Sequence, residues 1–246
     1  MDRLVYVAMS GAKETLRAQA ANNHNLANAN TNGFRGDLAA FQTQNVVGSG
    51  LPSRAYATND ITGWDSSSGS LDATGRPLDV AIKGFGWIAV QASDGSEAYT
   101  RAGDLRIDPD GTLTTARGNP VLGDSGPITV PAYTSINIGV DGSVSVVPWG
   151  QPPMTVSAVG RIKLVNPSSD QVSRGSDGLF RSNSGQPLDS DASVHLISGT
   201  LESSNVNIAE TMANMIELAR SYEVQVKAMK TAEDTAASST KLLQSS

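Results

Sequence analysis

Residues 206–243 read VNIAETMANMIELARSYEVQVKAMKTAEDTAASSTKLL, and this stretch decides the fold of the chain. Mostly apolar side chains recur along it at alternating steps of four and three residues, which is the spacing of a coiled-coil seam. The seam consists of Ile208, Met212, Met215, Ala219, Tyr222, Val226, Met229, Glu233, Ala236, Thr240 and Leu243. Asn207 followed by Glu210 predicts the N-cap, and no Gly or Pro interrupts the run. We therefore expect one helix of about 57 Å, which needs another long helix to cover its apolar stripe.

A second, weaker seam of the same spacing runs through the other end of the chain. It consists of Val5, Met9, Ala12, Leu16, Gln19, Asn23 and Leu26, with small and amide side chains at several positions. The sequence thus predicts an N-terminal helix (residues 1–36) and a C-terminal helix (residues 206–246). The two helices either pack on one globular body or pack between different molecules, and their spacing leaves both arrangements open.

The middle of the chain changes pattern near residue 76. Residues 37–75 hold scattered apolar side chains and Ser/Gly clusters, which predict an extended linker. From residue 76 the apolar pattern has period two, and Asp-Gly pairs at 94–95, 110–111, 141–142 and 177–178 indicate hairpins. Residues 76–205 are therefore expected to form an antiparallel all-β domain, either a sandwich or an open barrel.

The expected fold class is α+β. A central antiparallel β domain carries long N- and C-terminal α-helices, and these helices form a coiled-coil-like assembly domain.

Composition excludes several functional classes. The 246 residues carry a net charge of −6 and no Lys/Arg cluster, which argues against nucleic acid as a partner. The chain has no Cys, so disulfides, thiolate catalysis and Cys-ligated zinc are excluded. No apolar run approaches the roughly 18 residues of a membrane helix, so membrane insertion is not expected. The N-terminal residues also lack the pattern of a cleavable secretory signal peptide, because Lys13-Glu14 closely follows a short apolar run.

Residues that suggest catalysis are few. Neither His24 nor His195 lies in a context typical of a catalytic base, and the chain has no Gly-x-Ser-x-Gly motif. Residues 108–111 (DPDG) resemble part of a calcium loop but lack the later ligands, so we expect a hairpin turn. Paired carboxylates remain open because their separation is a tertiary property, although Asp94 and Glu97 fit an exposed hairpin end better. We predict no catalytic, cofactor-binding or metal-binding residues.

Four separated motifs resemble those of the bacterial flagellar rod and hook proteins. The first is Asn25-Leu26-Ala27-Asn28 followed by Thr31, Gly33 and Phe34, and the opening residues MDRL resemble proximal rod members in particular. The others are RPLDVAIKG at 76–84 with Gly86-Trp87, YTRAG at 99–103, and GTLESSNVN at 199–207 with Arg220, Tyr222 and Glu223 beyond it. The resemblance extends over the whole chain, although Trp87 stands where many members have Phe.

This resemblance implies a structural subunit of the proximal rod, the drive shaft of the flagellar basal body. Such a subunit polymerises through its terminal helices with other proximal and distal rod subunits in a helical hetero-polymer and transmits torque. It lies in the periplasm and is exported by the flagellar type III apparatus without a cleaved signal peptide. No enzymatic activity or cofactor is implied.

The helix assembly interface is expected at selected residues of the two terminal segments. They are Val5, Met9, Ala12, Leu16, Asn25, Leu26, Asn28, Ile208, Met212, Met215, Ala219, Tyr222, Val226, Met229 and Leu243. The alternative is a secreted carbohydrate-binding or adhesive β-protein whose helices form a stalk. A glycan site would need clustered exposed aromatic residues, whereas Trp64, Trp87 and Trp149 are far apart in the sequence.

Overall fold

A computed structural model of the chain describes the backbone of residues 2–45, 55–152 and 154–244, and the side chains of 5–38, 63–152 and 154–238. The chain divides into two compact units. The helical unit comprises Met1–Ala29, Gly36–Asp65 and Val206–Ser246, and the β unit comprises Asn30–Arg35 and Ser66–Asn205. The chain therefore enters the β unit twice, first at residues 30–35 and again from residue 66.

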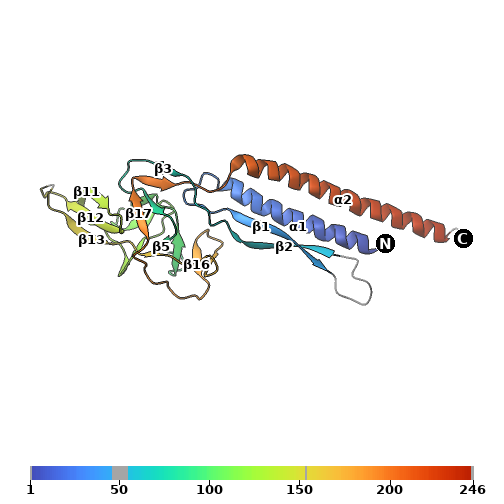
Figure 1. The fold of residues 1–246 in the computed structure, drawn as a ribbon, viewed down its shortest axis with the longest axis horizontal. Coiled ribbons are helices and arrows are strands. Elements are labelled where there is room, and N and C mark those ends of the chain that lie inside the picture. The colour runs from blue at the N-terminus through green and yellow to red at the C-terminus, as the bar shows by residue number, and fades with distance from the viewer. Residues whose placement is uncertain (1, 46–54, 153, 245–246) are drawn as a thin grey trace. The chain divides into compact units, whose positions relative to one another are not determined.

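The helical unit combines two long helices with one pair of antiparallel strands. Helices α1 (Asp2–Ala27) and α2 (Ile208–Gln244) lie side by side, and strands β1 (Asp37–Asn45) and β2 (Ala55–Trp64) run along α1 (Figure 1). The N-cap expected at Asn207 is confirmed, since its Oδ1 accepts hydrogen bonds from the backbone N–H groups of Ala209 (3.0 Å) and Glu210 (3.3 Å).

Two expectations for the N-terminal half were wrong. Helix α1 ends at Ala27 rather than at residue 36, because Asn28 bonds back to the last turn and Gly33 adopts φ 67°, a left-handed conformation. Residues 37–45 and 55–64 pair as the antiparallel strands β1 and β2 instead of forming an extended linker, and residues 71–73 form a further strand, β3 (Leu71–Ala73). Backbone groups within these three strands are thus satisfied by strand pairing.

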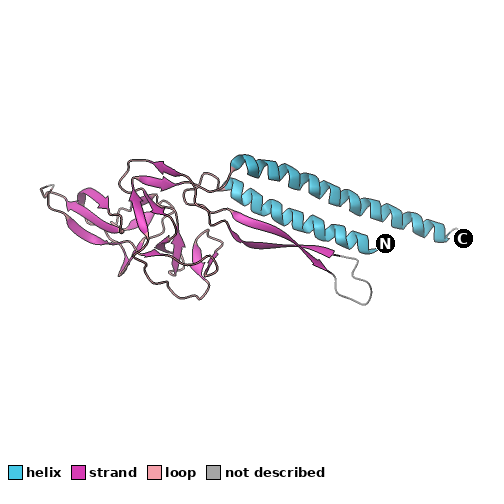
Figure 2. Ribbon diagram, in the orientation of Figure 1, coloured by secondary structure: helices cyan, strands magenta, loops and turns pink. Residues whose placement is uncertain are grey.

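The described part of the β unit contains strands and loops but no helix (Figure 2). Beyond β3, its strands are β4 (Val80–Lys83), β5 (Trp87–Gln91), β6 (Glu97–Thr100), β7 (Leu105–Ile107), β8 (Leu113–Thr115), β9 (Leu122–Gly123), β10 (Gly126–Pro127), β11 (Tyr133–Ile138), β12 (Ser143–Pro148), β13 (Ser157–Arg161), β14 (Leu164–Val165), β15 (Val172–Arg174), β16 (Phe180–Ser182), β17 (His195–Ser198) and β18 (Thr200–Glu202).

Pairing between these strands is antiparallel, as expected, but it does not produce two large sheets. The largest sheet has the order β14-β5-β6-β16-β15, the next is β11-β12-β13, and the remaining strands pair two by two. All four Asp-Gly pairs lie at hairpin turns, and each Gly has φ between 80° and 84°. Only Gly adopts this conformation without a steric penalty, so these four hairpins are set by local sequence.

One apolar core fills the β unit. Ile88, Val90, Leu105, Leu113 and Val121 are fully buried within a single cluster that draws on most of the sheets. This core joins the many short strands into one compact unit, because each small sheet buries its apolar face against the others.

Candidate functional site

The two helices of the helical unit approach each other over small and polar side chains. A Cβ added at Gly11 would lie 3.0 Å from the side chain of Gln225, so no larger residue fits there without movement. Asn22 Nδ2 donates a hydrogen bond to the carbonyl oxygen of Thr211 at 2.8 Å. These contacts show that the α2 row containing positions 211 and 225 faces α1.

Helix α2 carries two neighbouring rows of side chains. The row that faces α1 is buried or half-buried, follows the four-three spacing, and comprises Thr211, Met215, Leu218, Tyr222, Gln225, Met229 and Ala232. The other row, which we call the outer stripe, comprises Ile208, Met212, Ala219 and Val226. At 100° per residue its four members fall within about 40° of one another around the helix. Ile208, Met212 and Val226 are 40%, 48% and 40% exposed, so most of this row is uncovered in the single chain.

The predicted seam is therefore divided between these two rows. Met215, Tyr222 and Met229 lie on the side that faces α1, whereas Ile208, Met212, Ala219 and Val226 form the outer stripe. Leu243 lies outside the residues whose side chains are described.

Helix α1 shows a similar division. Met9 and Leu16, seven residues apart, are 51% and 48% exposed, and Val5 on the same side is half-buried. Ala12, from the same predicted seam, is buried. Both helices thus leave large apolar side chains uncovered, although such side chains normally drive burial.

Asn25 and Asn28 have local roles that sequence spacing did not indicate. Asn25 Nδ2 donates to the Asp37 carbonyl oxygen (2.9 Å), and its Oδ1 accepts from the Asp37 backbone N–H (2.7 Å), which joins α1 to the start of β1. Asn28 Nδ2 donates to the His24 carbonyl oxygen at 2.9 Å and closes the end of α1. Leu26 is half-buried nearby in sequence.

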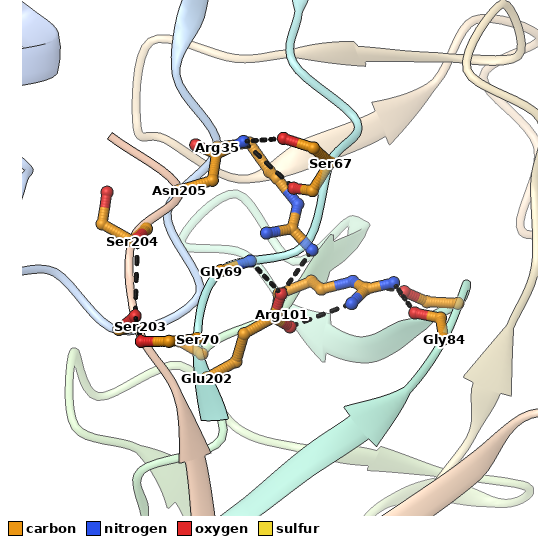
Figure 3. A network of polar contacts seen from close by, with 12 residues as sticks. Arg35, Ser67, Gly69, Ser70, Gly84, Arg101, Glu202, Ser203, Ser204 and Asn205 are labelled. Carbon is orange, nitrogen blue, oxygen red and sulfur yellow. Dashed lines mark hydrogen bonds and ion pairs between the residues drawn. The ribbon is translucent and has the colours of Figure 1, made fainter. Parts of the chain in front are cut away.

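The β unit contains a buried ion cluster formed by Arg35, Arg101 and Glu202 (Figure 3). Glu202 Oε1 accepts hydrogen bonds from Arg35 Nη2 (2.6 Å) and the Gly69 backbone N–H (3.0 Å), and its Oε2 accepts from Arg101 Nη1 (2.9 Å). All three charged residues are at most 4% exposed. One carboxylate therefore joins three chain segments that are distant in the sequence.

Arg101 extends this cluster to the turn between β4 and β5. Its Nε donates to the Gly86 carbonyl oxygen at 2.9 Å, and its Nη2 donates to that of Gly84 at 2.5 Å. Burial lowers the pKa of Arg101 from its usual value, and the Glu202 carboxylate opposes this change. The cluster holds two guanidinium groups against one carboxylate, so Glu202 is essential to the electrostatic balance of this interior.

No sequence pattern indicates this cluster, although Arg101 and Glu202 lie inside two of the four family motifs and Arg35 directly follows another, the one that ends at Phe34. The motif that ends at Phe34 requires glycine at position 33, since a Cβ there would lie 2.2 Å from the backbone carbonyl carbon of Arg101. Phe34 is buried, and the Arg174 guanidinium lies 4.7 Å from its ring centroid. Residues 33–35 are thus built into the β unit.

The histidines are placed in unrelated surroundings. His24 Nδ1 lies 2.6 Å from Asp37 Oδ2 in the helical unit, whereas His195 is exposed in β17. The described residues contain no group of three or more side chains suited to hold a metal ion. Neither helix, over its described residues, combines the length and hydropathy needed to cross a bilayer.

The tryptophans do not gather on one surface. Trp87 is 4% exposed in the core, Trp149 is 77% exposed, and Trp64 belongs to the other unit. This distribution gives no support to a glycan-binding platform.

Comparison with known proteins agrees with these features. Residues 81–146 match the family model "Flagellar hook protein FlgE/F/G D1 domain", and residues 197–242 match "Flagellar basal body rod FlgEFG protein C-terminal". The flagellar basal-body rod protein FlgF of Escherichia coli K12 is 44% identical over 249 residues, covering 99% of both chains. The chain belongs to the family of flagellar basal-body rod proteins.

Other rod proteins are similar over nearly the same length. FlgF of Salmonella typhimurium LT2 is 44% identical over 99% of both chains, and FlgG of Bacillus subtilis 168 is 33% identical over 95% of this chain and 96% of its own. Within this rod protein, the C-terminal match spans the end of β17, all of β18 and most of α2, so it contains both Glu202 and the outer stripe.

Proposed function

We propose that this chain is a structural subunit of the proximal rod of the flagellar basal body, and that it polymerises through its terminal helices to transmit torque. The observation that carries the proposal is the 44% identity to two FlgF proteins over 99% of each chain. The sequence similarity includes both ends, which hold the helices.

The exposed apolar rows of α1 and α2 support assembly through these helices. Apolar area that stays exposed to water contributes no hydrophobic stabilisation. Contact with a neighbouring helix at four-three spacing would bury this area, and each Å² buried would contribute about 25 cal/mol. A contact between unlike surfaces of successive subunits extends into an open helical filament. The coiled-coil-like assembly domain is thus expected between subunits as well as within one.

The partners proposed are other proximal and distal rod subunits, together with the flagellar export apparatus. The location proposed is the periplasmic part of the rod, reached without a cleaved signal peptide. We also infer that the chain is no enzyme and needs no cofactor, since the relatives that it matches over its whole length are rod proteins.

Val226→Asp tests the assembly surface. Val226 is 40% exposed in the single chain, so the substitution should spare the protomer, but in a helix contact it would bury an unpaired carboxylate. We expect a cost of about 3–5 kcal/mol at each subunit contact, and therefore loss of incorporation into rods and of swimming. Incorporation is measured by immunoblotting purified basal bodies from cells whose own copy is deleted, and thermal unfolding of the β unit should be unchanged.

Glu223→Gln is the matched control. Glu223 is exposed three residues away on the same helix, and replacing it should cost only about tenths of a kcal/mol. Normal assembly of Val226→Asp would remove the outer stripe from the assembly surface. Absence of the wild-type chain from purified basal bodies would overturn the rod function itself.

A further inference from the structure

The turn between β4 and β5 displays an aromatic side chain to solvent. Phe85 is 74% exposed and lies between Gly84 and Gly86. A single exposed apolar residue is common on protein surfaces, so exposure alone carries no conclusion. The way the turn is held is the informative feature.

The backbone on both sides of Phe85 is fixed from beneath. Arg101 donates to the carbonyl oxygens of Gly84 and Gly86, and it is itself held by Glu202 in the buried ion cluster. Gly86 has φ 133°, and a Cβ there would lie 2.6 Å from Val194 Cγ1, so only Gly fits. A buried guanidinium thus holds the turn in a shape that keeps the ring in solvent. Rigid presentation of an aromatic side chain lowers the entropy cost of binding, and such side chains dominate binding energies.

The neighbouring surface carries an exposed lysine. Lys83 and His195 are cross-strand partners in the β4–β17 ribbon, and both are exposed. The chain carries 24 Asp and Glu residues against 18 Lys and Arg residues, so the surface of another copy offers an excess of carboxylates to an exposed lysine. An aromatic anchor two residues from an exposed lysine therefore suits the acidic surface of another copy of this chain.

We propose that Phe85 anchors a contact with a second copy of this chain in the rod, with Lys83 facing a carboxylate of that copy. The contact is separate from the helix stripes and lies on the β unit. It rests on the proposed function, because it requires that copies of the chain lie next to one another in a filament.

Site-specific photo-crosslinking in assembled basal bodies tests the contact. A benzophenone amino acid replaces Phe85, and irradiation should give an adduct of about 51 kDa, twice the 25.5 kDa chain, whose peptides all come from this chain. Adding Lys83→Glu should lower the yield of this adduct by about tenfold, the effect expected of losing a central charge pair. The same probe at Val140, a turn residue of the β unit that is 63% exposed, should give no such adduct.

Other results would contradict the proposed Phe85 contact without contradicting the proposed rod function. These are an adduct with a different protein, no adduct from rods that contain the chain, or equal two-chain adducts from positions 85 and 140. Absence of the probe-free chain from rods would instead overturn the proposed function.

Arg101→Lys tests whether the turn must be held. Lysine keeps the positive charge beside Glu202, but its single ammonium group lacks the planar fork that reaches two carbonyl oxygens. We expect the two-chain adduct to fall several-fold in rods that still contain the variant. An unchanged yield would show that Arg101 does not position Phe85.

Discussion

The two units of this chain use their side chains in opposite ways. In the β unit, large apolar residues such as Ile88 and Leu113 are fully buried, and even a three-residue ion cluster is withdrawn from water. In the helical unit, the buried apolar residues of α1 are alanines, whereas Met9 and Leu16 are about half exposed. The β unit therefore buries its large apolar residues within itself, whereas the helical unit leaves several of its own exposed.

Free energy explains this difference. Fixing a residue costs about 1–2 kcal/mol of backbone entropy, which a buried alanine offsets poorly because it removes little apolar area from water. The outer stripe of α2, together with Met9 and Leu16 of α1, holds apolar area that stays exposed in the single chain. Covering it would add stability only in an assembly, so rod formation and ordering of the helices should be linked.

The sharpest test of the contrast is Glu202→Ala. It leaves two buried guanidinium groups without their carboxylate, and we expect the free energy of unfolding of the β unit to fall by about 3–5 kcal/mol. Urea unfolding followed by the fluorescence of buried Trp87 measures this loss. Glu210→Ala, which removes an exposed carboxylate from α2, is the control and should leave the transition unchanged. A loss below about 1 kcal/mol for Glu202→Ala would mean that the cluster contributes little.

A matched pair of truncations compares the two interiors directly. Leu113→Ala opens a cavity in a fully buried site and should destabilise the β unit by about 3 kcal/mol. Met215→Ala removes a half-buried side chain facing α1 and should cost about 1 kcal/mol or less, because solvent already reaches the site. Thermal unfolding of the β unit and hydrogen exchange of the α2 amides report the two effects. Equal losses would break the contrast between the units.

The smallest expected effect concerns Asp141 in the β11–β12 turn. Hydrogen bonds from the Ser143 hydroxyl and backbone N–H, together with Arg161, lower the pKa of Asp141 to about 2. A carboxyl whose pKa falls on folding stabilises the native state above its usual pKa of 3.8, and this contribution is lost as the pH falls towards 2. Because the group is exposed, Asp141→Asn should cost only about tenths of a kcal/mol at pH 7.

That difference between wild type and Asp141→Asn should disappear near pH 2. Urea unfolding at several pH values measures it, with Ser143→Ala as the variant that removes the same hydroxyl donor. A difference that grew as the pH fell would contradict the assignment.

Local chemistry made much of the fold predictable. The four Asp-Gly turns and the uninterrupted 206–243 helix follow from residue preferences that act within a few positions. The pairing of residues 37–45 with residues 55–64 was missed because these strands lack a strong alternation of apolar and polar residues, and strand pairing supplies the stability that the pattern does not show.

The candidate site was less predictable for two reasons. Met215, Tyr222 and Met229 belong both to the predicted four-three seam and to the row that faces α1, so spacing alone could not decide which side of α2 meets α1. The ion cluster joins Arg35 to Glu202 across 167 positions and Arg101 to Glu202 across 101, and no local pattern reports such a meeting. Only the three-dimensional arrangement brings these charges together.

The ion pair between Arg35 and Glu202 also sets the order in which the chain can mature. A polypeptide emerges from the ribosome N-terminus first, so Arg35 can pair with the Glu202 carboxylate only after 167 further residues have been synthesised. The hydrogen bond from Asn22 to Thr211 requires a longer segment still, because the two residues are 189 positions apart. Both contacts are long-range and of the kind that slows folding, since the entropy of closing a large loop is lost before the contact contributes any stability. The chain is thus built to stay incompletely folded until nearly its whole length has been made.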